Sequence, residues 1–334
     1  MRITSAVALL IFVAVGCGGG RRQPPAKSDI MVTDFVGETV SLKSPARRVV
    51  CLMESALSGM YMLRAQDRVV GVPAAVYRES AAPQYALLDE RIRRQEIPAP
   101  GNWDFVNIES LVALQPDLVI IWASQEEAIA NIRRFGIPVY AVMLHRLEDV
   151  YKEIADLAIL LDKTDRGRQL TQWTRDELSH FQSKGLDSRK NKIYFMWSQG
   201  LLHTAGKNST VNQIIEAAGG VNACPLETEH CVVNLERLLD WQPDVVVMWH
   251  NERLDPNDIV TDSRLQSLPA VKKGQVYELP SVFYCDMWTL KFQYVIKMVA
   301  RWSDPQRFSA IDLPSERRRM LRFLYGRRAG ALLE

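Results

Sequence analysis

Hydrophobic and polar positions follow the same pattern twice in this chain. "VNIESLVALQPDLVIIW" runs from Val106 to Trp122 and "VNLERLLDWQPDVVVMW" from Val233 to Trp249, with 9 of 17 positions identical. In each copy, apolar residues recur at helical spacing up to a proline, which cannot continue a helix. A continuous apolar run follows, as is typical of a strand buried on both faces of a parallel sheet. Each copy therefore predicts a helix that leads into a central strand.

The first turn of each repeated helix carries the same two polar residues. Asn107 and Asn234 stand where a short amide side chain can cap the exposed N–H groups of a helix. Glu109 and Glu236 follow two residues later, where a negative charge meets the positive end of the helix dipole. Dipole pairing alone is enough to account for these two carboxylates.

Strands alternate with helices on both sides of the repeat. The alternation around Gly37 predicts a hairpin, and apolar strand-like runs such as "RRVVCLM", "IPVYAVM", "NKIYFMW" and "GQVYELP" are separated by helical patterns. Between about residues 148 and 184 there is no strand pattern, and "DKTDRGRQLTQWTRDELSHFQSK" predicts one long helix. The fold class is therefore α/β, with two Rossmann-like lobes of parallel sheet joined by that helix. We place the N-terminal lobe at residues 31–150, the helical linker at 151–187 and the C-terminal lobe with terminal helices at 188–334.

Composition narrows the function classes. The chain has 334 residues, 47% apolar and 24% charged, with a net charge of +2, which is ordinary for a globular protein and does not indicate nucleic-acid binding. The basic end "SERRRMLRFLYGRR" fits a solvated helix face, with a membrane-surface role as the alternative. A Gly-rich phosphate loop, a nucleophile elbow and an HExxH motif are all missing. We therefore predict a protein that is not an enzyme, with a secreted α/β enzyme as a remote alternative.

The first 30 residues have the pattern of an export signal and a tether. Residues 1–16 hold one early arginine and a short apolar core that ends in small residues, too short to span a bilayer. "AVGC" is similar to a bacterial lipobox, which predicts that Cys17 is acylated and becomes the first mature residue. Residues 17–30 then form a polar flexible tether. Plain cleavage and secretion is the alternative, and no other segment is apolar and long enough to cross a membrane.

Export changes the interpretation of the remaining cysteines, because disulfides persist in oxidising compartments. Cys224 and Cys231 bracket "PLETEH", a loop short enough to be closed by a local disulfide. A metal site formed by these two cysteines with His230 is the alternative, although the spacing fits no familiar zinc pattern. Cys51 lies within a predicted strand and should be buried.

A family resemblance follows from several segments together. "VTDFVGETVSLKSPARRVV", "DRVVGV", the two repeat copies and "STVNQIIEAAGGVN" resemble the substrate-binding proteins of bacterial ABC importers for iron–siderophore, haem and vitamin B12. The resemblance extends from about Met31 to Phe308. It implies two lobes on a rigid helical backbone, a ligand cleft between them, and a monomer that delivers its ligand to an ABC permease dimer. Contact with the membrane would be through the lipid anchor only.

The resemblance gives the repeated carboxylates a second meaning. In the family, one glutamate on each lobe docks into arginine pockets of the two permease subunits, and the matching positions here are Glu109 and Glu236. A pair of like charges on two similar lobes suits a two-fold symmetric partner. Docking and helix capping remain open alternatives, and one carboxylate can do both.

Candidate ligand-binding residues lie where predicted strands end, because ligands of parallel α/β lobes bind beyond the carboxyl ends of the strands. These positions are rich in aromatic rings, which suit a bulky ligand that is part planar and part polar. The alternative for Trp122 and Trp249 is that they close their strands in the core. The candidates are Glu54, Tyr77, Arg78, Trp103, Trp122, Trp197, Trp249, Tyr284 and Trp288.

The ligand class stays open at this point. Glu54 suits a cationic metal or an amide-rich corrinoid, whereas Arg78 favours anionic ligands such as carboxylate siderophores or molybdate-like oxyanions. A free zinc or manganese ion would need clustered histidines, and the five histidines are scattered. We therefore predict a metal chelate as ligand and no resident cofactor or metal, with an oxyanion or a free metal ion as alternatives.

Overall fold

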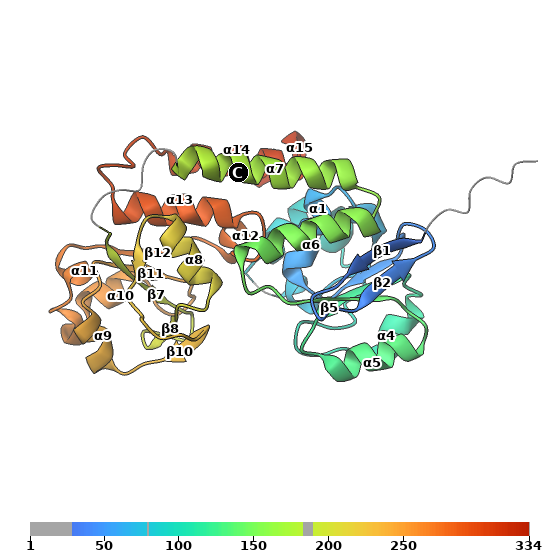
Figure 1. The fold of residues 1–334 in the computed structure, drawn as a ribbon, viewed down its shortest axis with the longest axis horizontal. Helices are drawn as coiled ribbons and strands as arrows, with labels where there is room; N and C mark the ends of the chain where they lie inside the picture. The colour runs from blue at the N-terminus through green and yellow to red at the C-terminus, as the bar shows by residue number, and fades with distance from the viewer. Residues whose placement is uncertain (1–28, 79, 183–189, 334) are drawn as a thin grey trace, which may run out of the picture.

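The computed structural model describes residues 29–78, 80–182 and 190–333, and they form two α/β lobes under a layer of helices (Figure 1). Each lobe has one four-stranded sheet, with strand order β4-β3-β5-β6 in the first and β12-β11-β7-β9 in the second. All neighbouring strands in both sheets are parallel, so the predicted fold class is confirmed. The predicted lipidation site Cys17 and the signal peptide lie outside the described residues. Within the described residues, no helix combines the length and the apolarity that a membrane span requires.

The N-terminal lobe opens with the predicted hairpin, whose turn uses Gly37 at φ +87°. Its elements are β1 (Ile30–Thr33), β2 (Thr39–Leu42), β3 (Val49–Cys51), α1 (Glu54–Met62), β4 (Val69–Gly71), α2 (Ala82–Leu88), α3 (Glu90–Arg93), α4 (Ile108–Ala113), β5 (Leu118–Trp122), α5 (Glu126–Arg134) and β6 (Val139–Val142), with 3-10 turns at Gln66–Arg68 and Ala74–Tyr77.

The C-terminal lobe repeats this alternation and adds a short antiparallel pair, β8 with β10, beside its sheet. Its elements are β7 (Lys192–Met196), β8 (His203–Ala205), α8 (Thr210–Ala217), β9 (Val221–Asn222), β10 (His230–Val232), α9 (Leu235–Trp241), β11 (Val245–Met248), α10 (Pro256–Thr261), α11 (Pro269–Lys272), β12 (Val276–Glu278) and α12 (Val282–Cys285), with a 3-10 turn at Ser263–Leu265.

The repeated segments form α4 with β5 and α9 with β11, as predicted, and both strands are central in their sheets. The amide oxygen of Asn107 accepts from the N–H of Ser110, and that of Asn234 accepts from Arg237, each over 2.9 Å. In both copies the backbone then turns before the proline through a glutamine in the left-handed conformation, Gln115 at φ 48° and Gln242 at φ 47°. The repeat is therefore conserved in backbone conformation as well as in sequence.

The linker between the lobes contains two helices, α6 (Leu147–Leu160) and α7 (Thr164–Gln182), and α7 is the long helix predicted within "DKTDRGRQLTQWTRDELSHFQSK". The break lies at Asp162, whose φ of +54° ends the first helix. α7 then packs closely against α6 because Gly167 has no side chain: a Cβ there would lie 2.5 Å from that of Ala158. The predicted long helix is confirmed as the 19 residues of α7, about 28 Å at 1.5 Å per residue.

The C-terminal helices return over both lobes as α13 (Phe292–Ser303), α14 (Leu313–Tyr325) and α15 (Arg327–Leu332) (Figure 1). The Arg166 guanidinium of α7 donates to the carbonyl oxygens of Phe323 and Leu324 in α14. Tyr325 Oη shares a 2.6 Å hydrogen bond with Ser58 of α1. α14 is thereby tied to both the linker and the first lobe.

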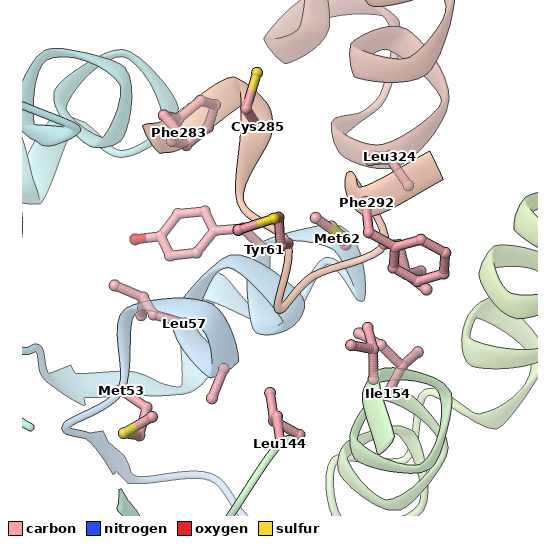
Figure 2. Close-up of a cluster of buried hydrophobic side chains, with 14 of the residues drawn as sticks. Met53, Leu57, Tyr61, Met62, Leu144, Ile154, Phe283, Cys285, Phe292 and Leu324 are labelled. Carbon is pink, nitrogen blue, oxygen red and sulfur yellow. The ribbon is translucent and has the colours of Figure 1, made fainter. Parts of the chain in front are cut away.

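The two lobes share one buried core beneath these helices. Figure 2 shows side chains from α1 and α6 meeting others from the C-terminal third of the chain, among them Leu57, Ile154, Phe283, Phe292 and Leu324. The same cluster continues into the second sheet through Phe195 and Val247. Because packed cores resist deformation, this arrangement favours small rather than large movements between the lobes.

A buried ionic network closes the helical layer. The Lys297 ammonium of α13 donates to Glu177 of α7 over 2.8 Å and to Glu316 of α14 over 2.7 Å, and Arg319 pairs with both carboxylates. Burial raises the pKa of Glu177, but hydrogen bonds from Arg319 and Lys297 outweigh it, so the pKa lies below its usual range. The network joins three helices at their contact.

Candidate functional site

Three tryptophans meet at the carboxyl edge of the second sheet, and we call Trp197, Trp249 and Trp288 the tryptophan wall. Trp197 follows β7, Trp249 follows β11, and Trp288 comes from the segment after α12. Their ring centroids are 5.7 Å (Trp197 to Trp249), 6.2 Å (Trp197 to Trp288) and 5.9 Å (Trp249 to Trp288) apart. The three predicted residues thus form one aromatic surface.

The backbone fixes two of these rings in place. The N–H of Trp249 donates to the carbonyl of Met196 over 2.7 Å, which continues the pairing of β11 with β7 past the end of the sheet. The N–H of Trp288 donates to Asp286 Oδ1 over 2.9 Å. Asp286 is buried, and this burial raises the pKa of its carboxyl group. The wall is therefore held by the strand ends themselves and by one short loop.

Trp197 is the base of the wall, since only 6% of its surface is exposed, while Trp249 and Trp288 are half-buried. One face of Trp197 stacks on the imidazole of His230 at 4.7 Å and 26°. Its Nε1 is buried and has no hydrogen-bond partner among the residues that the structure describes. The predicted role of Trp249 as a strand-closing core residue is compatible with this position, because it also packs on the main core.

The first lobe contributes different chemistry at its strand ends. Tyr77 and the exposed Arg78 line a surface hollow of about 570 Å³ whose wall also includes Phe105. The Tyr77 hydroxyl donates to the carbonyl of Ile97 over 2.7 Å. Trp122 ends β5, half-buried against the core, and Glu54 begins α1, also half-buried. This edge is mixed in polarity, whereas the edge of the second lobe is aromatic.

Two exposed aromatic rings project from the loop before α4. Trp103 is 58% exposed and Phe105 is 51% exposed. The loop is nonetheless held in shape, because the side-chain amide of Gln125 donates to the carbonyls of Asn102 and Trp103. Phe105 lines the hollow beside Tyr77 and a second hollow of about 530 Å³ above Gln125. Trp103 is therefore a surface residue next to the mixed edge of the first lobe.

Tyr284, predicted as a ligand-binding residue, makes its contacts with the C-terminal part of the chain. The short helix α12 directs its ring among the C-terminal helices, where the hydroxyl donates to the carbonyl of Leu333 over 3.0 Å. The guanidinium of Arg317 lies 5.1 Å from the ring centroid. The tyrosine is thus used to hold the C-terminus of the chain.

The predicted disulfide is not formed in this structure. The Sγ atoms of Cys224 and Cys231 are 3.4 Å apart, beyond the bonded distance of about 2.05 Å, and both residues are free thiols in contact. The described part of the chain holds no cluster of three or more His, Cys, Asp or Glu side chains placed to bind a metal ion. Cys51 is fully buried, as predicted, and burial raises the pKa of its thiol.

The repeated carboxylates occupy matching places on the two lobes. Glu109 and Glu236 are both exposed, each in the second position of its helix, α4 or α9. Figure 1 shows α4 and α9 on the same side of the molecule, opposite the layer that holds α7 and α14. Neither carboxylate has an ion-pair partner within the residues that the structure describes.

Sequence reasoning missed the contribution of His230 to the aromatic surface and considered it only as a metal ligand. Its ring reaches Trp197 because β10 pairs with β8, placing His230 opposite Ala205. Two strands of three residues each carry too little alternation to be recognised in a sequence. The position of His230 next to Cys231 was the one available signal.

Two parallel α/β lobes on a shared helical base, with an aromatic surface at the strand ends of one lobe, define a two-lobed solute-binding protein. The sequence matches the family model for periplasmic binding proteins over residues 49–283. The chain therefore belongs to the periplasmic binding protein family.

Known proteins with similar sequences or structures differ in the ligand that they bind. The chain is 24% identical to a vitamin B12-binding protein of Vibrio parahaemolyticus, covering 74% of this chain and 86% of that protein. It is also 24% identical to the molybdate-binding protein MolA of Haemophilus influenzae, covering 86% and 88%. The solved structure of MolA bound to molybdate superposes with a TM-score of 0.76 at 22% identity, covering 88% of this chain and 97% of that one.

Proposed function

We propose that this protein captures a bulky metal chelate, of the corrinoid, haem or ferric-siderophore type, and delivers it to the permease of an ABC importer. The observation that carries this proposal is the tryptophan wall. The half-buried rings of Trp249 and Trp288 lie about 6 Å apart against the buried ring of Trp197 and offer an apolar surface, which suits a large planar ligand. The similarity to a vitamin B12-binding protein supports the same ligand class.

The polar side chains beside the wall already contact one another, which fits a ligand without concentrated charge. The Nδ1 atom of His250 lies 3.3 Å from Glu278 Oε1, and the same carboxylate accepts from the N–H of Asn251 over 2.8 Å. No lysine or arginine makes a cation–π contact with the three rings in the described part of the chain. A small oxyanion would need such cations or convergent N–H donors.

An oxyanion is the second candidate, and two observations favour it. Arg78 is exposed at the carboxyl edge of the first sheet, and the chain is similar to a molybdate-binding protein over 86% of its length. In that case the ligand would bind in the hollow lined by Tyr77 and Arg78, and the tryptophan wall would not contact it. The two candidates thus place the ligand on different lobes.

Native mass spectrometry and tryptophan fluorescence with a fixed panel distinguish the two candidates. The panel consists of cyanocobalamin, haemin, a ferric catecholate, a ferric carboxylate siderophore and molybdate. We expect a chelate to bind and to quench the tryptophan emission strongly, because the ring system would cover Trp249 and Trp288. Binding of molybdate alone, without such quenching, would replace the chelate proposal by the oxyanion one.

We also propose that Glu109 and Glu236 dock the protein onto the two permease subunits. Both are exposed, unpaired within the described residues and on one side of the molecule, so they are free to meet external cations. The pairing of like elements on the two lobes suits a partner with two-fold symmetry. Charge pairs of this kind set the orientation and the association rate of a complex.

The final part of the proposal is export with a lipid anchor at Cys17. Family membership supports export, and the lipobox-like "AVGC" supports acylation. Labelled palmitate should enter the wild-type protein in cells and should not enter Cys17→Ser, which would be released from the membrane. Labelling that persists in Cys17→Ser would show that the anchor lies elsewhere.

A further inference from the structure

The loop between Cys224 and Cys231 connects two parts of the molecule that matter for binding. At one end, His230 stacks on Trp197, the base of the tryptophan wall, at 4.7 Å. Next to it, Glu229 Oε2 lies 3.5 Å from His145 Nδ1, which belongs to the segment between β6 and α6 in the first lobe. The loop therefore touches both the aromatic surface and the opposite lobe.

The middle of this loop is held to the segment that follows β8. The N–H of Lys207 donates to the carbonyl of Leu226 over 2.7 Å, and the side-chain amide of Asn208 donates to that of Glu227 over 2.8 Å. Gly206 makes the approach feasible, since a Cβ there would lie 2.4 Å from the carbonyl oxygens of Leu226 and Thr228. The centre of the loop is thus fixed by the backbone, which leaves its two ends to be fixed by the cysteines.

The two thiols lie in position to close the loop. Cys224 is buried, its N–H donates to Asn222 Oδ1 over 3.1 Å, and its sulfur lies 3.4 Å from that of the half-buried Cys231. Cys231 stands opposite Thr204 in the β10–β8 pair, so its backbone is restrained as well. A sulfur–sulfur approach of about 1.4 Å, from 3.4 Å to about 2.05 Å, completes a bond.

We propose that Cys224 and Cys231 form a disulfide after export, and that this bond holds His230 against Trp197 and so shapes the tryptophan wall. The coupling to ligand affinity rests on the proposed function, whereas the disulfide and its effect on the wall do not.

The chemistry balances with an external disulfide as oxidant, from a small molecule or an exported oxidoreductase. The more accessible Cys231, as thiolate, attacks one sulfur of the external disulfide and releases one external thiol. Cys224 then loses its proton and attacks Cys231 Sγ, which releases the second external thiol. Two protons and two electrons pass from the protein to the oxidant. Burial raises the pKa of the Cys224 thiol to about 12, which suits it to the second, resolving step rather than the first.

Peptide mapping of protein exported by living cells tests the bond itself. The sample is alkylated under denaturing conditions without reduction, and we expect one cross-linked pair of peptides containing Cys224 and Cys231. Cys51 and Cys285 are fully buried and serve as internal controls that should be alkylated as free thiols. Alkylation of both Cys224 and Cys231 in the exported protein would overturn the proposal.

Near-ultraviolet circular dichroism of the ligand-free protein tests the coupling to the wall. We expect reduction to change the tryptophan bands of the wild type, because it releases the stacking partner of Trp197. The change should be absent in the double variant Cys224→Ser with Cys231→Ser and in His230→Ala, both treated identically. A wild-type spectrum that is the same in both redox states would overturn the coupling while leaving the bond.

Titration with cyanocobalamin and haemin then links the bond to affinity. If the reduced loop holds the wall in its binding geometry about one third of the time, reduction should weaken the affinity about threefold. Equal affinity in both redox states would overturn that link. Should neither probe bind in either state, the corrinoid and haem candidates fail, and the spectra alone decide whether the bond shapes the wall.

Discussion

The two lobes are alike on the side that carries α4 and α9 but differ at the carboxyl edges of their sheets. On the outer side, α4 and α9 begin with the same asparagine cap and carry an exposed glutamate at the same position. At the carboxyl edges of the sheets, the first lobe has Tyr77 and Arg78 by a hollow of mixed polarity, whereas the second has three packed indoles. A repeated unit thus keeps the features that a symmetric partner would require and varies those that an asymmetric ligand would contact.

This comparison presupposes that the helical layer holds both lobes in fixed positions. Breaking the ionic network of Lys297 tests this, and we expect it to give the largest change in stability. Replacing Lys297 by Met removes a buried cation from between Glu177 and Glu316. We expect a loss of about 3 kcal/mol in the free energy of unfolding, the lower end of the range for breaking a buried pair, because Arg319 still pairs with both carboxylates.

Urea denaturation measures this loss, with Lys43→Met as the matched control. The Lys43 side chain is 91% exposed in its pair with Asp29, so its replacement should cost at most about 0.5 kcal/mol. Equal, small losses in both variants would mean that the network does not fasten the lobes.

The aromatic edge of the second lobe gives the next largest effect. Trp249→Ala and Trp288→Ala should each weaken chelate binding by about 2 kcal/mol, as is common for central aromatic residues of a binding surface. The control is Trp302→Ala, which removes a half-buried indole that stacks on Tyr277, at 4.9 Å, outside the wall. Fluorescence titration reads the affinities. A loss from Arg78→Gln that exceeds both wall variants would move the ligand to the first lobe.

Replacing the two helix caps tests how similar the outer sides of the two lobes are. Asn107→Ala and Asn234→Ala should each lower stability by about 1 kcal/mol, because each removes one side-chain acceptor from an exposed helix N-terminus. Thermal unfolding of the two variants should give nearly equal shifts. A much larger loss at one position would show that the two caps contribute differently to stability despite their shared geometry.

Acid sensitivity separates the helical base from the lobes. The pKa values of Glu177 and Glu316 are lowered in the folded protein: burial raises them, but hydrogen bonds from Lys297 and Arg319 outweigh burial. A depressed pKa adds stability that is present above the unfolded value, near 4.5, and is lost as the pH falls through the folded value. Wild-type protein should therefore lose more stability between pH 6 and about pH 3.5 than Lys297→Met. Parallel pH profiles would contradict this linkage.

The sequence predicted the repeated helix–strand unit well because its caps, its proline and its apolar run are all local features. It also placed Trp197, Trp249 and Trp288 at one edge, since parallel strands end at the same side of a sheet. It did not give the directions that depend on tertiary packing. Tyr284 turns towards Leu333, and the left-handed conformation of Asp162 separates α6 from the predicted long helix α7.

Other parts of the site could not be predicted from local pattern at all. His230 reaches the wall through two very short paired strands, and Gly167 and Gly206 act through close approach rather than through any periodic signal. Such contacts join residues far apart in the chain. The sequence therefore gives the edge of the sheet where the ligand would bind but not the surface formed there.

The central claim is that matched outer carboxylates serve a partner while unmatched inner edges serve the ligand. It is tested most directly by measuring chelate affinity and cellular uptake side by side for Glu109→Lys, Glu236→Lys and the double variant. Each reversal should cripple uptake, since losing one member of a buried interfacial charge pair costs about 2–5 kcal/mol. Chelate affinity should stay at the wild-type value, and the cost to folding should stay near 0.3–1 kcal/mol, about the size of the helix-dipole effect. Affinity that falls together with uptake, or uptake that does not change, would contradict the account.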